Sequence, residues 1–300
     1  MINAPTAGIL FGLSAAVLQS ASYLFSRRFV LRHQNATLRL LVASHLWMAL
    51  MAVVIYPFAR SPDMPPVMTY IGPLLGSAGF YMAGQAGLFA LMRHTQASRV
   101  APLLGLKLLV LAVIVTGFMG QSLSLNQWGS VGLCVLAAFL IQTAGVRLTW
   151  QALAWLDLAC LGYSLSDLSI TRLVHALHPI PKFHASVIGV CLSYAVCGLV
   201  ALPLWRLAGI SRNGIPWGPA LPFAGFWFAS MVVLYACFGL VGALYGNILQ
   251  STRGLISVLF GYALSRAGFH ELEEPQSRRV LIQRTAAAAL MFTAIWLFHA

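Results

Sequence analysis

The sequence predicts an all-α membrane protein of about ten transmembrane helices, arranged as two inverted five-helix repeats around a central cavity. The prediction rests on composition, on the number of long apolar runs and on an internal repeat. Sixty per cent of the 300 residues are hydrophobic and only 8% are charged, whereas soluble domains carry roughly 25% charged residues. Because so few charges cannot cover a water-facing surface, the outer surface of the fold must contact lipid.

Ten apolar runs approach the roughly 20 residues that a helix needs to cross a bilayer. The predicted spans are Ala7–Phe25, Leu40–Phe58, Val67–Met92, Val100–Met119, Trp128–Val146, Leu148–Leu173, Ala185–Leu204, Leu221–Leu244, Leu255–Phe269 and Val280–Phe298. The ninth run is the shortest. Five spans fall in residues 1–147 and five in residues 148–300, which we take as the two repeats. The connections between them are short, so we expect no soluble domain.

Basic residues outnumber acidic residues by 18 to 6, which gives a net charge of +12. In a soluble protein this balance would suggest nucleic acid as a partner. Here the basic residues lie mostly at the ends of apolar runs, where they contact anionic lipid headgroups. We therefore expect membrane lipids and no nucleic acid as partners. The five cysteines lie inside apolar runs without CxxC spacing, so we expect neither a disulfide framework nor a metal site.

Short polar words recur in the two halves. Gln96–Arg99 reads QASR and Gln250–Arg253 reads QSTR, 154 residues later, and Tyr81 matches Tyr235 at the same offset. A second set of matches, at an offset of 144, pairs Ser20, Ser22, Arg28 and Val30 with Ser164, Ser166, Arg172 and Val174. Since five spans per half is an odd number, the two halves must be inverted in the membrane. Inverted repeats are typical of secondary transporters, in which two halves move around one site.

Pairs of small residues four positions apart occur within the third predicted span and at the end of the eighth. They are Gly72 and Gly76, Ala83 and Gly87, and Gly242 and Gly246. Such spacing lets helix backbones approach closely in lipid. We expect these residues to serve helix packing, and the alternative is that some mark bends around a substrate.

Several segments resemble the drug/metabolite transporter superfamily in its ten-helix EamA-like form. Thr95–Pro102, with the preceding Ala90 and Leu91, looks like the family's turn between its third and fourth helices, and Gly120–Gly129 looks like the entry to its fifth helix. The resemblance implies two five-helix halves around a central cavity, with the fifth and tenth helices peripheral, and it names no substrate. One departure concerns coupling. Related four-helix transporters use a first-helix Glu for protons, but Ala7–Phe25 contains no acidic residue.

Two charged residues lie inside predicted spans, where an unpaired charge costs several kcal/mol. Lys107 lies near the middle of the fourth predicted span and Asp167 lies within the sixth. We expect Lys107 to contact a substrate anion and Asp167 to bind a cation or proton. The alternative is that they pair with each other or with Arg172 and hold the bundle together. Asp157 is nearer a span end, and we expect it to be interfacial.

Further polar residues lie on helices that the resemblance places around the cavity. They are Tyr23, Tyr81, Gln85, Tyr235, Asn247 and Gln250. Substrate binding and interhelical hydrogen bonding are both open for each of them. Arg99 and Arg253 begin the fourth and ninth spans, and we expect them near opposite membrane faces as gating or interfacial residues.

These features favour a secondary transporter, an exporter or permease, that moves a small metabolite, amino acid or amphipathic drug by alternating access. One alternative is a non-transporting membrane protein, such as a sensor, assembly factor or intramembrane enzyme. Another is a nucleotide-sugar or organic-phosphate transporter of the same superfamily. The sequence has no Walker A, GxSxG, HExxH or Rossmann motif, so we expect no enzyme and no cofactor. We expect a bacterial inner membrane location. Proton coupling and the choice between monomer and homodimer stay open.

Overall fold

The computed structural model describes residues 3–33, 36–92, 104–141, 149–207, 216–253, 256, 259–260, 263 and 278–298. Within these ranges all the regular secondary structure is helical, which confirms the predicted all-α class. The elements are α1 (Ala4–Arg32), α2 (Ala36–Ala59), α3 (Val67–Met92), the 3-10 turn η1 (Leu104–Leu106), α5 (Lys107–Gly117), α6 (Leu125–Ile141), α7 (Trp150–Ala176), α8 (Lys182–Leu207), α9 (Trp217–Ser251) and α11 (Arg278–Leu297). The predicted number of ten spans is not established by these ranges.

Four helical segments of the described chain are long and apolar enough to cross a membrane. They are Ala4–Ser26, Leu38–Ala59, Lys182–Arg206 and Trp217–Ser251. Helix α7 has 27 residues and is about 40 Å long at 1.5 Å per residue, but it contains Asp157, Asp167 and Arg172. A membrane helix that keeps such charges must direct them to protein, water or the interface.

Local sequence fixes where the first helix of each half begins. The backbone N–H of Thr6 donates to the Asn3 side chain at 2.9 Å, and that of Ala152 donates to the Thr149 side chain at 3.3 Å. Each side chain satisfies a backbone donor that the first helical turn leaves without a helical partner. Helices α1 and α7 therefore each start at a residue whose side chain caps the first turn.

The outer surface of the helical bundle is apolar. Large hydrophobic side chains such as Phe58, Met68, Val53 and Leu199 are more than half exposed. In water this exposure would be a strong liability, but in lipid it is the favourable arrangement. The surface agrees with the composition and with an integral membrane protein.

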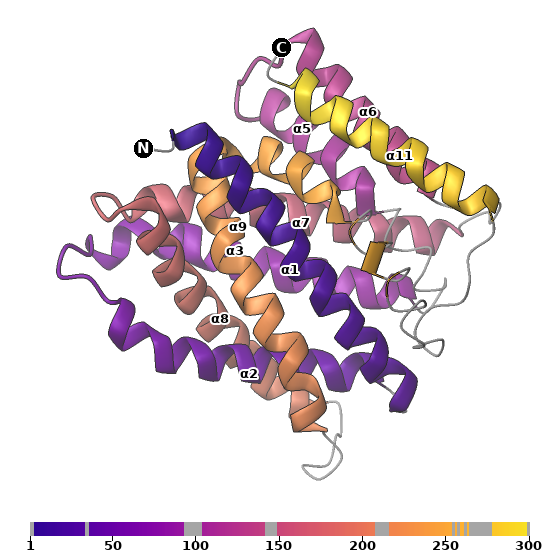
Figure 1. Ribbon diagram of the computed structural model, residues 1–300. Helices are drawn as coiled ribbons and strands as arrows, with labels where there is room; N and C mark the ends of the chain where they lie inside the picture. The colour runs from indigo at the N-terminus through magenta and orange to yellow at the C-terminus, as the bar shows by residue number, and fades with distance from the viewer. Residues whose placement is uncertain are drawn as a thin grey trace.

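Long helix pairs build the bundle, and each pair joins one helix from residues 1–147 with one from residues 148–300. Helix α1 packs along α9, α3 along α7, α2 along α8, and α6 along α11. Figure 1 shows α6 and α11 side by side at the edge of the bundle, away from α2 and α8. This position agrees with the peripheral fifth and tenth helices that the family resemblance implies.

Helix α9 consists of two stretches joined at Gly242, where the backbone is non-helical with a φ of 79°. Glycine adopts this left-handed φ without the steric cost that a Cβ brings. The predicted boundaries of the eighth and ninth spans were wrong here. The interval between these two predicted spans, which contains Asn247 and Gln250, is helical as far as Ser251, and both residues are buried. The two helical stretches need no loop between them, because the non-helical backbone of Gly242 is enough to separate them.

Helices α3 and α7 approach so closely that their backbones touch. A Cβ on Gly162 of α7 would lie 2.7 Å from the backbone N of Gly84 and 2.9 Å from the carbonyl O of Phe80. The packing role predicted for Gly76 and Gly87 is confirmed, because a Cβ there would meet Ser169 and Ala159 of α7.

The same prediction was wrong at two other glycines. A Cβ on Gly72 would meet nothing within 4 Å, since this residue is on the exposed side of α3. Gly242 forms the turn described above. Small-residue spacing thus indicates packing only where the residues face a partner helix.

We predict that Gly162→Ala lowers the free energy of unfolding by about 1–3 kcal/mol, the usual cost of overpacking. The added methyl group would collide with backbone atoms, which cannot move aside as a side chain can. Gly79→Ala on α3 is the matched control, because a Cβ there meets nothing within 4 Å. Thermal unfolding in detergent should show a lower melting temperature for Gly162→Ala only. Equal melting temperatures for the two variants would contradict the close approach.

Candidate functional site

A cavity of about 290 Å³ lies in the middle of the bundle, between α1, α2, α3, α5, α7 and α9. Its wall contains three charged groups, those of Lys107, Asp167 and Arg253. Aromatic side chains form much of the remaining wall, namely Tyr23, Tyr81, Tyr163, Phe223 and Trp227. A few polar groups set in an apolar and aromatic wall are typical of sites that bind small molecules.

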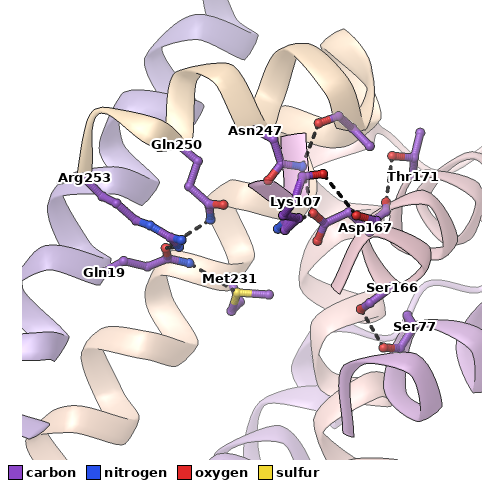
Figure 2. Close-up of polar contacts among 12 residues, drawn as sticks. Gln19, Ser77, Lys107, Ser166, Asp167, Thr171, Met231, Asn247, Gln250 and Arg253 are labelled. Atoms are coloured by element: carbon purple, nitrogen blue, oxygen red, sulfur yellow. Dashed lines mark hydrogen bonds and ion pairs between the residues drawn. The ribbon is translucent and has the colours of Figure 1, made fainter. Parts of the chain in front are cut away.

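The first polar cluster joins three helices. Lys107 Nζ of α5 lies 2.6 Å from Asp167 Oδ2 of α7, and Asn247 Nδ2 of α9 donates to the same oxygen at 2.7 Å. Figure 2 shows these three side chains meeting at Asp167. The pairing that the sequence left as an alternative is therefore present, and both charged residues also line the cavity.

We predicted Lys107 near the middle of a continuous helical span. The structure instead makes it the first residue of α5, directly after η1. The 3-10 turn changes the helical path just before the lysine. The lysine also lies 5.9 Å from the centre of the Tyr163 ring, close enough for a cation–π interaction. The ammonium group is thus held between a carboxylate and an aromatic face.

The second polar cluster surrounds Gln19 of α1. Its side-chain Oε1 accepts from Gln250 Nε2 at 3.0 Å and from Arg253 Nη1 at 3.1 Å. Ser20 donates to the backbone carbonyl of Arg253 at 2.9 Å. Gln19 and Gln250 are buried, so they hold the guanidinium group in a fixed position at the cavity wall (Figure 2).

The two clusters share one helical face. Asn247 and Gln250 are three residues apart on the second stretch of α9, and residues with that spacing are neighbours on a helix surface. The stretch therefore presents one amide to Asp167 and the next to Gln19.

Most of the candidate residues come together at this cavity. Those that line it are Tyr23, Tyr81, Gln85, Lys107, Asp167, Gln250 and Arg253. Asn247 is not a lining residue, but it donates a hydrogen bond to Asp167, which lines the cavity. Tyr235 is not among the lining residues and is buried, with its ring near Gly189 of α8. Arg99 lies outside the described residues, and Asp157 is exposed, as expected for an interfacial position.

Gln19, His45, Tyr163 and Trp227 also line the cavity, and sequence reasoning did not select them. His45 of α2 is buried, and its Nδ1 is 2.8 Å from the Leu41 carbonyl oxygen. Because a carbonyl only accepts, Nδ1 carries the hydrogen in this bond. The buried Nε2 has no hydrogen-bond partner within the described ranges. At His45 the available signal was an ionisable side chain inside an apolar run.

Comparisons with known proteins agree with this description. Residues 6–143 match the EamA-like transporter family, which confirms the resemblance for this part of the chain and indicates a membrane transporter of the drug/metabolite type. No curated protein matches the chain. A protein chain of known crystal structure is similar with a TM-score of 0.67 and 14% identity, over 97% of each chain. At that identity the likeness shows the fold alone.

We predict that Lys107→Met and Asp167→Leu each lower the free energy of unfolding by about 3–5 kcal/mol, because each leaves a buried charge without its partner. The double variant should recover most of this loss, since it leaves no unpaired charge. Thermal unfolding of the three variants in detergent measures the coupling between the two side chains. Additive losses in the double variant would show that the two groups do not stabilise each other.

Proposed function

We propose that the chain, whose residues 6–143 match the EamA-like transporter family, is a secondary transporter that works by alternating access. Its substrate is a small metabolite, amino acid or amphipathic drug, and its location is a bacterial inner membrane. The observation that carries the proposal is the central cavity, in which the charged groups of Lys107 on α5 and Asp167 on α7 meet an amide group of α9 inside an apolar bundle. A helix keeps charges at such a place only where a partner, water or a ligand offsets the cost.

The helix pairs support two repeats, residues 1–147 and 148–300. We propose that α1 is equivalent to α7, α2 to α8, α3 to the first stretch of α9, α5 to the second stretch, and α6 to α11. If each helix is replaced by its equivalent, the packed pair α1–α9 becomes the packed pair α7–α3. The pairs α2–α8 and α6–α11 stay the same, because each consists of two equivalent helices.

Individual contacts follow the same equivalence. A Cβ on Gly8 would meet Val241, and a Cβ on Gly87 would meet the backbone at Trp155. The sequence offset of 154 relates Val241 to Gly87, and the offset of 144 relates Gly8 to position 152, which is one helical turn from Trp155. The similar positions of these two contacts support the proposal of two inverted copies.

In an alternating-access mechanism, Lys107 and Asp167 could each exchange the other for a substrate group as ion-pair partner. The pair joins α5 of the first half to α7 of the second, and Asn247 adds α9 to the same oxygen. A substrate that bears a charge would compete with one partner of the pair and so alter the contact between the halves. Asp167 is also the only carboxyl group in the cavity wall that the structure describes, which makes it the group through which we propose to test proton coupling.

Two other readings are weaker. A sensor, assembly factor or intramembrane enzyme has no need for two matched halves around one cavity. A nucleotide-sugar or organic-phosphate transporter would need space and positive charge for a large polyanion. The described cavity is about 290 Å³ and contains two cationic side chains, one of them paired with Asp167.

We predict that the Lys107→Met, Asp167→Leu double variant folds and fails to transport. The reason is that removing both groups restores charge balance but leaves no charged contact for the substrate at this point. Uptake into proteoliposomes should be measured against a metabolite panel, with and without a proton gradient. Arg172→Met is the matched control, because Arg172 is an exposed charge on the same helix as Asp167. Normal uptake by a stable double variant would reduce the pair to a packing element.

We predict that Arg28 and Arg172 lie on opposite sides of the membrane. Both are exposed near the ends of α1 and α7, which are equivalent helices in the proposed inverted repeats. Arg28→Cys and Arg172→Cys should therefore react with a membrane-impermeant maleimide from opposite sides of oriented vesicles. The five native cysteines are buried and provide a low background. Labelling of both variants from the same side would exclude inverted halves.

A further inference from the structure

Arg253 has an incomplete set of partners for a cation inside a membrane protein. Within the described ranges, its guanidinium group makes one side-chain hydrogen bond, from Nη1 to the neutral Gln19 Oε1 at 3.1 Å. Among the described residues, the one ion pair joins Lys107 to Asp167, so no described carboxylate neutralises Arg253. A guanidinium group has five N–H donors in a planar fork, and the described side chains accept from one of its nitrogen atoms, Nη1.

The position of this guanidinium group is set by buried neighbours. Gln19 accepts from both Gln250 and Arg253, and the exposed fractions of the two glutamines are 1% and 4%. The Gln19 amide nitrogen in turn faces Met231 Sδ at 3.7 Å. Both glutamines are therefore occupied in orienting the arginine, and the arginine is left to contact whatever enters the cavity.

The charges of the described cavity wall indicate the charge of the ligand. Among the described residues, the cavity wall carries two cations, Lys107 and Arg253, and one carboxylate, Asp167. Since Lys107 is already paired with Asp167, one positive charge is left at Arg253. A single negative charge on a ligand would balance it, and a carboxylate matches the planar guanidinium fork with two parallel hydrogen bonds.

We propose that Arg253, oriented by Gln19 and Gln250, is the carboxylate-binding subsite of the cavity, and that the substrate is a small organic monocarboxylate. This assignment rests on the transporter function proposed above and specifies its substrate class. The ring of Tyr163 and the side chains of Phe223 and Trp227 line the same cavity, so they provide apolar surface for the body of the acid. The volume of about 290 Å³ restricts the ligand to a small molecule.

A phosphate monoester would present similar oxygen atoms to Arg253. It carries close to two negative charges at neutral pH, whereas the unbalanced charge of the described cavity is one. The structure therefore favours the carboxylate, and the experiment includes a phosphate ester to separate the two sources of oxyanion.

Binding to the purified full-length protein in detergent tests the proposal directly. The probes are phenylacetate, phenylacetamide and 2-phenylethylamine, which share one aromatic body and differ in charge, together with phenyl phosphate. Phenylacetate should raise the melting temperature in a concentration-dependent manner, whereas the amide and the amine should not. Equal stabilisation by the amide or the amine would overturn the carboxylate subsite, and stronger stabilisation by phenyl phosphate would overturn the monoanion assignment.

Variants at Arg253 connect that binding to the residue. Arg253→Gln should weaken phenylacetate binding about tenfold or more, and Arg253→Lys, which keeps the charge without the planar fork, should give an intermediate loss. Arg172→Gln removes an exposed charge elsewhere and should bind normally. Unchanged binding by Arg253→Gln would overturn the assignment.

The comparison of acid, amide and amine on the unaltered protein needs no variant, so it holds even where a variant folds poorly. If benzoate, phenylacetate and 3-phenylpropionate all fail to bind, the monocarboxylate class is wrong. Uptake of another class of compound into proteoliposomes would then still support the proposed transporter function. If no compound is taken up, the transporter function itself is contradicted.

Discussion

The buried ion pair between Lys107 and Asp167 is the constraint on which the centre of this protein depends. Its nitrogen and oxygen atoms are 2.6 Å apart, and each side chain is only about a tenth exposed. Charges in such a place must be paired, because desolvation costs each of them several kcal/mol. The pair fixes where α5 meets α7, and the amide of Asn247 brings α9 to the same point. The polar centre is therefore assembled from segments that are remote in the sequence.

Around this centre, the helices are held by close packing of small residues, since lipid offers no hydrophobic drive for helices to associate. The α3–α7 interface illustrates the effect, because Gly84 and Gly162 bring the two backbones into contact. The exposed side of α3 carries Gly72 and Gly79, where an added Cβ would meet nothing within 4 Å. Rigid contact between α3 and α7 on one side of the cavity keeps Tyr81 and Tyr163, with ring centres 6.2 Å apart, as a fixed wall.

The sequence was sufficient for the fold class and for the rarest residues of the site. Lys107 and Asp167 could be selected because a charged side chain inside a membrane span is energetically costly unless it is paired, hydrated or bound to a ligand. Gln19 and His45 could not be selected, since a neutral polar residue in a membrane helix is often satisfied by its own backbone. The position of Lys107 at the start of α5 also escaped prediction, because apolar composition does not reveal a 3-10 turn. Gly242 was misread for a similar reason, since glycine is common within membrane helices.

The turn at Gly242 has a mechanical consequence for the cavity. Because a single residue joins the two stretches of α9, the short stretch that follows can rotate about the backbone bonds of that residue without disturbing a loop. Asn247 and Gln250 lie on this stretch, and they contact Asp167 and Gln19 respectively. One rotation would displace both amides together, so a molecule that pulls on one cluster changes the geometry of the other. The acidic and the basic ends of the cavity are therefore linked through one helical segment that begins at Gly242.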